Sequence, residues 1–503
     1  FCFGLAHSSL VLKNYFSMSS PKTFFSVSVI LVLSVLAAVS APNVIYILAD
    51  DLGYGDLSCY GQETLQTPHL DRLAENGMRF TSHYAGATVC APSRYVLMTG
   101  KHGGHAAIRD NGVNALAEDE FTLAELFKGA NYQTACIGKW GVGTPPDDLD
   151  ANRAGFDLFY GYNNMFHAHN YYPEFLIRNG KKEMLRNEVP DFFNQSTSSM
   201  PMPYYSEGRG VATRKVDYAP QLIHNEALKF IEDNKDDPFF LYYALNIPHA
   251  NNEGGFGWKE NGQRINGPEF NGMAVPDLRE FSDKNWPIQE KGFARMIQHI
   301  DDWVGEIVAL VEALDLTEDT LIMFTSDNGP HHEGNHDHEF FNSNGDLQGY
   351  KRDLYNGGIR VPFIVSWPGK IASGTQSGLM SGFQDMMPTM AEIIGSKIPD
   401  SDGISIYPEL TGNAQAQEKH EFLYWEFPAA GGKQALLYLN QWKLIRQGLS
   451  RDEPVKLELY DITSDVAEER DVADVYPALT KRLFDLMMEQ HVPYNEIWDL
   501  TRK

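Results

Sequence analysis

The sequence predicts an α/β protein with a large mixed, mostly parallel sheet between helices and a smaller C-terminal antiparallel-sheet subdomain. Five continuous apolar runs indicate strands that are buried on both faces, as in a parallel sheet covered by helices. These runs cover residues 44–49, 134–138, 239–247, 321–325 and 361–367. Helical patterns occur at residues 68–76, 123–127, 219–234, 292–314 and 385–394. This alternation predicts an α/β sandwich, in which ligands bind beyond the carboxyl ends of the strands.

The pattern changes after residue 412, where short strands with tight connections replace the alternation. They are expected at residues 422–427, 435–439, 442–446 and 456–460, with a helix at residues 479–490. We therefore predict a main domain at residues 42–412 and a C-terminal subdomain at residues 413–503. Three long segments rich in Gly, Asn, Pro and aromatic residues are expected to be loops that shape a substrate pocket. They are residues 160–213, 251–285 and 331–349.

The charge of the chain limits its partners. Its 503 residues include 41 Lys and Arg against 67 Asp and Glu, which gives a formal net charge of −26. Such a chain is not expected to bind nucleic acid or an anionic membrane through its general surface. An anionic substrate must therefore be attracted by a few concentrated positive groups.

Residues 1–41 are predicted to be an upstream segment followed by a secretory signal peptide. Met18 is the expected start, an apolar run covers residues 24–36, and cleavage is expected after Ala41. The protein is therefore expected to be exported, to the periplasm or out of the cell, with no stable membrane insertion after cleavage. An uncleaved anchor is the alternative, although the apolar run is short for a membrane span.

Export would leave three cysteines, Cys59, Cys90 and Cys136. Three cysteines do not make a disulfide framework. If Cys90 has a catalytic role, Cys59 and Cys136 can pair or stay as free thiols. We favour free thiols, because nothing in the spacing requires a bond.

Hard oxygen ligands follow two of the predicted strands. Asp50 and Asp51 end one apolar run, and Asp327 and Asn328 follow another. An all-oxygen set suits calcium or magnesium rather than zinc. Each pair taken alone is more often a turn or a helix cap, so the metal site depends on both pairs lying together.

A second metal hypothesis rests on four histidines in one short segment, His331, His332, His336 and His338. Histidine is a favoured ligand of zinc and copper. The segment is a Gly- and Asn-rich loop without the H-E-x-x-H pattern of a metalloprotease helix. We therefore favour histidines that face solvent or substrate over a transition-metal site.

The segment V-C-A-P-S-R-Y-V-L-M-T-G at residues 89–100 predicts a helix with a cysteine at its N-terminus. Pro92 is typical of a first helical turn, and Gly100 is placed to end the helix. A helix N-terminus lowers the pKa of a thiol and attracts anions, so Cys90 is a candidate nucleophile with Arg94 one turn away. The alternative is a buried apolar cysteine beside a solvated arginine.

Cys90, Pro92 and Arg94 fit the pattern C-x-P-x-R, and with Ser93, Thr99 and Gly100 the segment resembles the signature of the type I sulfatases of the alkaline phosphatase superfamily. The resemblance implies an alkaline-phosphatase-like fold and a formylglycine that a sulfatase-maturing, formylglycine-generating enzyme forms from Cys90. It also implies one divalent cation, usually calcium. The ligands that it implies are Asp50, Asp51, Cys90 as formylglycine, Asp327 and Asn328.

The same resemblance implies a mechanism. One hydroxyl of the hydrated aldehyde attacks sulfur, and loss of a proton from the second hydroxyl then re-forms the aldehyde and expels sulfate. The matching cations are Arg94, Lys139 in G-K-W, and Lys351 in G-Y-K-R-D-L-Y-N-G-G-I-R-V-P. His249 in I-P-H-A matches a histidine that helps to protonate the leaving oxygen.

One position departs from the family pattern. Many sulfatases read G-K-W-H-L-G, whereas this chain has Gly141 after Trp140, as in bacterial exported arylsulfatase-like enzymes with G-K-W-G. The missing histidine is thought to act as a base on the formylglycine hydroxyl. His169, in the segment H-A-H-N-Y-Y-P, is the candidate substitute, and a purely substrate-binding role for His169 is the alternative.

Three functions remain open at this point. The first is a calcium-dependent sulfatase that acts on a sulfated carbohydrate, as its export and aromatic, Asn-rich loops suggest. The second is a phosphate or phosphonate ester hydrolase of the same superfamily. The third, suggested by Gly141, is a sulfated-glycan binding protein with an impaired site.

Overall fold

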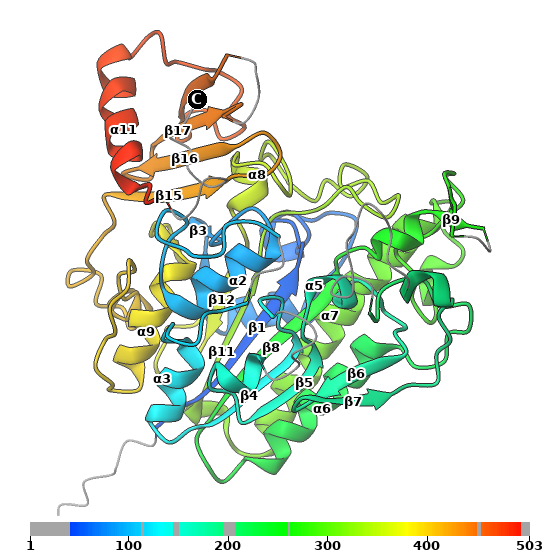
Figure 1. Ribbon diagram of the computed structural model, residues 1–503. Helices are drawn as coiled ribbons and strands as arrows, with labels where there is room; N and C mark the ends of the chain where they lie inside the picture. Colours follow the sequence, from blue (N-terminus) through cyan, green and yellow to red (C-terminus); the bar gives the residue numbers. More distant parts are fainter. Residues whose placement is uncertain are drawn as a thin grey trace, which may run out of the picture. The chain divides into compact units, whose positions relative to one another are not determined.

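The strand β1 (Asn43–Asp50) lies in the middle of a ten-stranded sheet, between β11 (Thr320–Ser326) and β8 (Phe239–Pro248). Beyond β8 follow β4 (Gln133–Lys139) and β5 (Leu158–Tyr162). These five strands are mutually parallel, so their carboxyl ends meet at one edge of the sheet. The computed structural model shows β1, in dark blue, deep in this sheet (Figure 1).

Further strands extend the sheet on both sides. Next to β11 comes β12 (Phe363–Ser366), followed by β2 (Met78–Phe80), and these pairings are antiparallel. The edge strand β13 (Thr375–Ser377) pairs in parallel with β2. On the other side, β6 (Phe175–Arg178) and β7 (Lys181–Met184) follow β5. The sheet is therefore mixed with a parallel centre, and the predicted fold class is confirmed.

Alternate residues of β1 point to two separate hydrophobic cores. Ile45 and Ile47 pack in one core, while Tyr46 and Leu48 pack in the other. The first core is completed by α1 (Pro68–Glu75), α6 (Ala219–Asp233) and α7 (Ile288–Ala313). The second is completed by α2 (Cys90–Thr99), α3 (Leu123–Gly129) and α9 (Met386–Ile393). Because both faces are covered, the central strands consist of continuous apolar residues.

The C-terminal sheet is four-stranded and antiparallel. Its strands are β15 (Phe422–Phe427), β16 (Lys433–Tyr438), β17 (Trp442–Gln447) and β18 (Lys456–Asp461). One face packs against α11 (Pro477–Gln490), drawn in red in Figure 1, through Leu483 and Met487. The other face packs against the part of the chain that carries the ten-stranded sheet. There the indole N–H of Trp425 donates to the Ala85 carbonyl at 2.8 Å.

Two of the long segments expected to be loops contain strands. Residues 160–213 contain β6, β7, the short helix α5 (Met165–Ala168) and the 3-10 turn η2 (Asp191–Asn194), so the prediction of a loop throughout is wrong there. It is also wrong for residues 251–285, where two short strands pair with each other. Other short elements complete the fold. They are η1 (Ser58–Tyr60), β3 (His83–Tyr84), α4 (Asp150–Arg153), η3 (Asn252–Gly255), β9 (Gly257–Trp258), β10 (Arg264–Ile265), η4 (Arg279–Phe281), η5 (Thr317–Asp319), α8 (Asn356–Ile359), β14 (Ser381–Gly382), η6 (Phe383–Asp385) and α10 (Tyr407–Leu410).

The structure describes residues 41–111, 115–143, 150–194, 207–259, 262–449 and 454–493. The predicted upstream segment and signal peptide lie outside the described residues, except for Ala41. Among the described residues, no helix combines the length and apolar character that crossing a bilayer requires. The proposed division of the chain near residue 412 stays a prediction.

Candidate active site

The register of the central strands brings the predicted site residues to one edge of the sheet. Ala49 on β1 pairs with Ser326 on β11, and Asp50 pairs with Pro248 at the end of β8. The residues that follow each strand are therefore neighbours. We call the four carboxylate and amide side chains at this edge the oxygen cluster (Asp50, Asp51, Asp327 and Asn328), and all four are buried.

Hydrogen bonds tie the oxygen cluster together across the two strands. The backbone N–H of Asp51 donates to Asp327 Oδ1 at 3.1 Å, and Asn328 Nδ2 donates to Asp51 Oδ1 at 2.7 Å. Asp51 has φ 64°, a left-handed conformation that is uncommon for a residue with a side chain. Strained backbone of this kind clusters at functional sites, where the surrounding structure holds it in place.

Cys90 is the first residue of α2 and is fully buried beside this edge. One oxygen or sulfur atom each of Asp50, Asp51 and Cys90 and one ring nitrogen of His249 all lie within 4.8 Å of one another. The predicted lowering of the Cys90 thiol pKa is wrong. Burial raises this pKa, and it outweighs the positive charges of Lys139 and Lys351.

Asn111 holds Cys90 in place and was not found from the sequence. Its Oδ1 accepts from the N–H of Ala91 at 3.1 Å, and its Nδ2 donates to Cys90 Sγ at 3.7 Å. The sequence offers only an Asn before a glycine, which is typical of a turn. Its approach to α2 depends on the tertiary fold.

Three buried cations surround the oxygen cluster, and we call Arg94, Lys139 and Lys351 the cation ring. Arg94 binds Asp327 Oδ2 through Nε at 2.9 Å and through Nη2 at 2.8 Å, and its Nη1 donates to the Lys139 carbonyl at 2.6 Å. Lys139 Nζ lies 2.7 Å from Asp50 Oδ2. Both side chains thus hold the oxygen cluster as well as supplying positive charge.

Lys351 connects the oxygen cluster to His249. Its Nζ lies 2.7 Å from Asp51 Oδ2 and 2.8 Å from His249 Nε2. The other ring nitrogen of His249 lies 2.7 Å from the Ala250 carbonyl, so Nδ1 carries the hydrogen and Nε2 accepts from the ammonium. Burial lowers the pKa of His249, and although burial alone would lower that of Lys351, Asp51 and Glu333 raise it above its usual value.

The pKa values of two carboxyl groups in the oxygen cluster are shifted in opposite directions. Burial alone would raise the pKa of Asp50, but the charges of Lys139 and Arg94 hold it well below its usual value. Burial and the charge of Asp50 raise the pKa of Asp327 to about 7. A cation bound here would favour the ionised form of each of these groups.

The donor atoms of the oxygen cluster suit a hard divalent cation. Asp50 Oδ1 and Asn328 Oδ1 are buried and have no hydrogen-bond partner among the described residues. Buried polar atoms normally have partners, so these two oxygens fit the role of metal ligands. Calcium and magnesium prefer this kind of oxygen set.

His169 lies beside His249, after α5. The two rings stack with centroids 4.2 Å apart, and His169 Nε2 is buried without a hydrogen-bond partner among the described residues. Burial lowers the pKa of His169 well below its usual value, so the ring is neutral. The structure therefore places an imidazole near the cation ring, although residue 141 has no side chain.

The four histidines of residues 331–338 do not form one cluster. His331 and His336 are buried, where His331 Nε2 contacts the Pro248 carbonyl at 3.0 Å and His336 Nδ1 contacts Glu290 Oε2 at 2.7 Å. His332 and His338 lie 3.5 Å and 3.9 Å from Asp337 Oδ1, and one ligand atom of each of the three residues lies within 4.8 Å of the others. Cys59 and Cys136 are free thiols, as expected.

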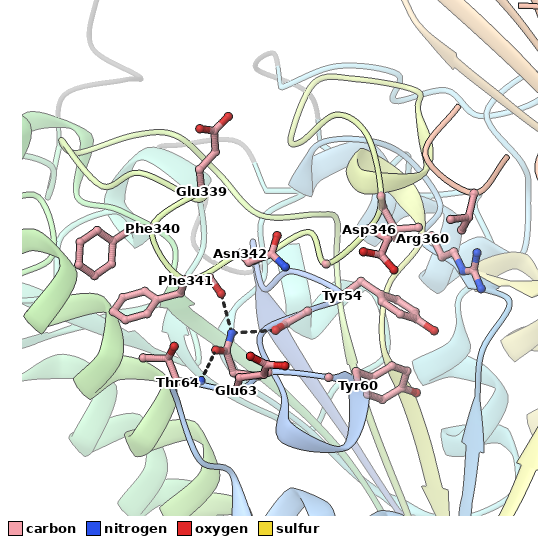
Figure 2. Close-up of a pocket in the computed structure, with 16 residues that line it drawn as sticks. Tyr54, Tyr60, Glu63, Thr64, Glu339, Phe340, Phe341, Asn342, Asp346 and Arg360 are labelled. Atoms are coloured by element: carbon pink, nitrogen blue, oxygen red, sulfur yellow. Dashed lines mark hydrogen bonds between the residues drawn. The ribbon is translucent and has the colours of Figure 1, made fainter. Parts of the chain in front are cut away.

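A separate cavity of about 470 Å³ opens where residues 339–347 meet the segment after Asp51. Gln62 joins its two sides by donating to the carbonyls of Gly55 at 2.9 Å and Phe341 at 2.8 Å, as the dashed lines in Figure 2 show. The labelled side chains include the acidic Glu63, Glu339 and Asp346 (Figure 2). No member of the oxygen cluster or the cation ring lines this cavity, whose acidic lining does not suit an anion.

The family follows from comparison with known proteins. Residues 42–396 match the sulfatase family model, and residues 347–492 match the model of the C-terminal region of N-sulphoglucosamine sulphohydrolase. The chain belongs to the sulfatase family and is a sulfuric ester hydrolase with the alkaline-phosphatase-like fold.

Individual relatives agree with this assignment. Human arylsulfatase A is 30% identical over 78% of this chain and 72% of its own length. An N-acetylgalactosamine-6-O-sulfatase of Bacteroides thetaiotaomicron is 28% identical over 89% of this chain and 92% of its own length. The crystal structure of Ps i-CgsB in complex with k-i-k-neocarrahexaose is similar with a TM-score of 0.71 and 27% identity, covering 92% of this chain and 96% of that chain.

Proposed function

We propose that the protein hydrolyses a sulfate ester of a sulfated carbohydrate, with formylglycine formed from Cys90 as the nucleophile and one calcium ion in the oxygen cluster. The observation that carries the proposal is the convergence of Cys90 with the oxygen cluster and the cation ring at one edge of the sheet. One similar protein is named an N-acetylgalactosamine-6-O-sulfatase, and another was crystallised in complex with k-i-k-neocarrahexaose, which supports a carbohydrate substrate.

The cation ring would bind the sulfuryl oxygens. The three cations are buried and already ordered by the oxygen cluster, so they need little reorganisation when negative charge develops. A buried donor of this kind is worth on the order of 10²–10³ in rate. Calcium held by the oxygen cluster would add positive charge beside residue 90.

Two histidines would handle protons. Lys351 Nζ lies 2.8 Å from His249 Nε2, and we assign these two neighbouring groups to the protonation of the leaving oxygen. His169 stacks on His249 beside the cation ring, and we assign it the role of the base that acts on the hydroxyl of residue 90. In this assignment, His249 and Lys351 act on the leaving oxygen and His169 acts on the hydroxyl of residue 90.

The test compares protein made with and without a co-expressed formylglycine-generating enzyme. Mass analysis of the peptide containing Cys90 is expected to show formylglycine only in the first preparation, and only this preparation should cleave aryl sulfate and sulfated sugars. Cys90→Ala should be inactive in both. Faster turnover of aryl phosphate than of aryl sulfate would favour the phosphate or phosphonate esterase, and glycan binding without sulfate release would favour an impaired binding protein.

A further inference from the structure

Arg352 adopts a backbone conformation that arginine rarely adopts. Its φ is 79°, in the left-handed region. Two hydrogen bonds hold it there, because its N–H donates to the Thr88 carbonyl at 3.0 Å and its carbonyl accepts from Lys433 Nζ at 2.8 Å. Thr88 lies two residues before Cys90, so this strained residue is attached to the segment that carries the nucleophile. Strained backbone of this kind clusters at functional sites.

Glu333 connects Arg352 to the buried site. Its Oε1 lies 2.5 Å from Arg352 Nη2, and its Oε2 lies 3.2 Å from Lys351 Nζ. Lys351 is 1% exposed, Glu333 is 11% exposed and Arg352 is 44% exposed. Exposure to solvent therefore increases from Lys351 through Glu333 to Arg352, and the guanidinium of Arg352 lies at the outer edge of the site.

This pair does not suit the sulfate group itself. A carboxylate repels sulfate, and the charge of Glu333 offsets that of Arg352. The pair does offer hydrogen-bond donors and acceptors side by side, in fixed directions. Two neighbouring hydroxyl groups of a sugar ring carry the matching acceptors and donors.

We propose that Arg352 and Glu333 bind two neighbouring hydroxyl groups of the sugar residue that carries the sulfate ester. This subsite selects sulfated sugars over sulfate esters of aromatic alcohols. The inference rests on the proposed function, since it places the sugar at the outer edge of the cation ring. Because the pair is close to neutral, it recognises hydroxyl groups rather than a second anionic substituent.

The test uses Arg352→Gly in the full-length, formylglycine-containing protein. Glycine adopts φ 79° readily, so the variant is expected to fold with an unfolding midpoint no lower than that of the parent. The measured quantity is the ratio of kcat/KM for a sulfated monosaccharide to kcat/KM for an aryl sulfate. Hydrogen bonds to charged groups predict a fall in this ratio on the order of 10-fold to 100-fold. Glu333→Gln should lower the same ratio.

Arg178→Ala is the matched control. Arg178 is 36% exposed and pairs with Glu226 at 2.7 Å, but it lies on β6 and contacts no member of the cation ring among the described residues. The ratio of kcat/KM for the sulfated sugar to kcat/KM for the aryl sulfate should be the same in Arg178→Ala as in the parent protein. Deoxy sugars provide a second measurement, since removing a hydroxyl next to the sulfate should slow the parent protein more than Arg352→Gly.

Each alternative result would count against the subsite. Equal losses on sugar and aryl substrates would mean that Arg352 only supports the catalytic groups. An unchanged ratio, or a parent protein that cleaves aryl sulfate but no sulfated sugar, would also overturn the inference. A formylglycine-containing parent that cleaves no sulfate ester at all would instead contradict the proposed function.

Discussion

The backbone of Gly141 lies directly against the side chain of Arg94. A Cβ atom at residue 141 would lie 2.9 Å from Arg94 Cδ, and the φ of Gly141 is 82°. A histidine cannot occupy this position without moving Arg94, which binds Asp327 and the Lys139 carbonyl. Because Arg94 occupies the space that a side chain at residue 141 would need, the position of Arg94 in the cation ring favours glycine in place of the histidine of G-K-W-H.

Gly141→Ala is expected to lower activity by displacing Arg94. The new methyl group must move the guanidinium or the loop by a few tenths of an ångström or more, and misplacement of about 1 Å can lower a rate by about 10²-fold. The expected result is a fall in kcat/KM on aryl sulfate of about 10-fold to 10²-fold. Steady-state kinetics on folded, formylglycine-containing protein would measure it.

Gly61→Ala separates this effect from backbone strain. Gly61 has φ 106°, but a Cβ atom there would meet nothing within 4 Å. Both variants should lose about 1–2 kcal/mol of stability from the left-handed backbone, and only Gly141→Ala should lose activity. Equal kinetics in the two variants would show that Arg94 tolerates the methyl group.

His169→Ala distinguishes the two roles considered for this residue. If His169 is the base that replaces the missing histidine, kcat should fall by about 10²–10⁴-fold with little change in KM. A role in substrate binding would instead raise KM with kcat nearly unchanged. The aryl sulfate assay is the informative one, because a small substrate makes fewer contacts with the surrounding loops.

Much of the fold and the site could be predicted because it depends on local patterns. The strands β1 and β11 are continuous apolar runs that end at Asp50 and Asp327, and parallel strands bring such ends together. The helix α2 begins at Cys90 and ends before Gly100, whose φ of 72° matches its place as the residue that terminates the helix.

Other features depend on packing that the sequence does not reveal. The strand β7 consists of exposed residues throughout, so it has no apolar alternation by which it could be recognised. The pKa of Cys90 was predicted from the helix N-terminus, but the depth of burial decides its direction. The contact of Asn111 with Cys90 joins residues from separate segments, and neither carries a motif for it.

Removal of divalent cations is expected to lower both activity and stability. The oxygen cluster has two buried oxygens without partners, and calcium bound there would stabilise the folded protein relative to the unfolded chain. At a free calcium concentration of about 100 times Kd the gain is about 2.7 kcal/mol. Thermal unfolding would measure this stabilisation: the unfolding midpoint should be higher with added calcium than with EGTA.

Asp327→Asn provides the control for the calcium effect. It keeps the size of the side chain but removes one charge from the oxygen cluster, so the calcium-dependent shift of the midpoint should shrink. Magnesium titrated in parallel would report which cation the site prefers. A midpoint of the parent protein that does not respond to either cation would argue against a metal in the oxygen cluster.

The buried pair of Arg109 and Glu426 is expected to hold the C-terminal sheet to the main part of the chain. Arg109 Nη1 lies 2.5 Å from Glu426 Oε1, and both side chains are almost fully buried. Tyr424 donates to the other carboxylate oxygen at 2.7 Å. Glu426→Ala would leave the guanidinium buried without its carboxylate partner, and breaking a buried ion pair in this way destabilises proteins by about 3–5 kcal/mol.

Glu188→Ala is the control. It removes an ion pair with Arg214 that is exposed, so the free energy of unfolding should fall by only about 0–1 kcal/mol. Urea unfolding of the two variants would measure the difference, and equal losses would mean that the buried pair contributes no more than a surface pair.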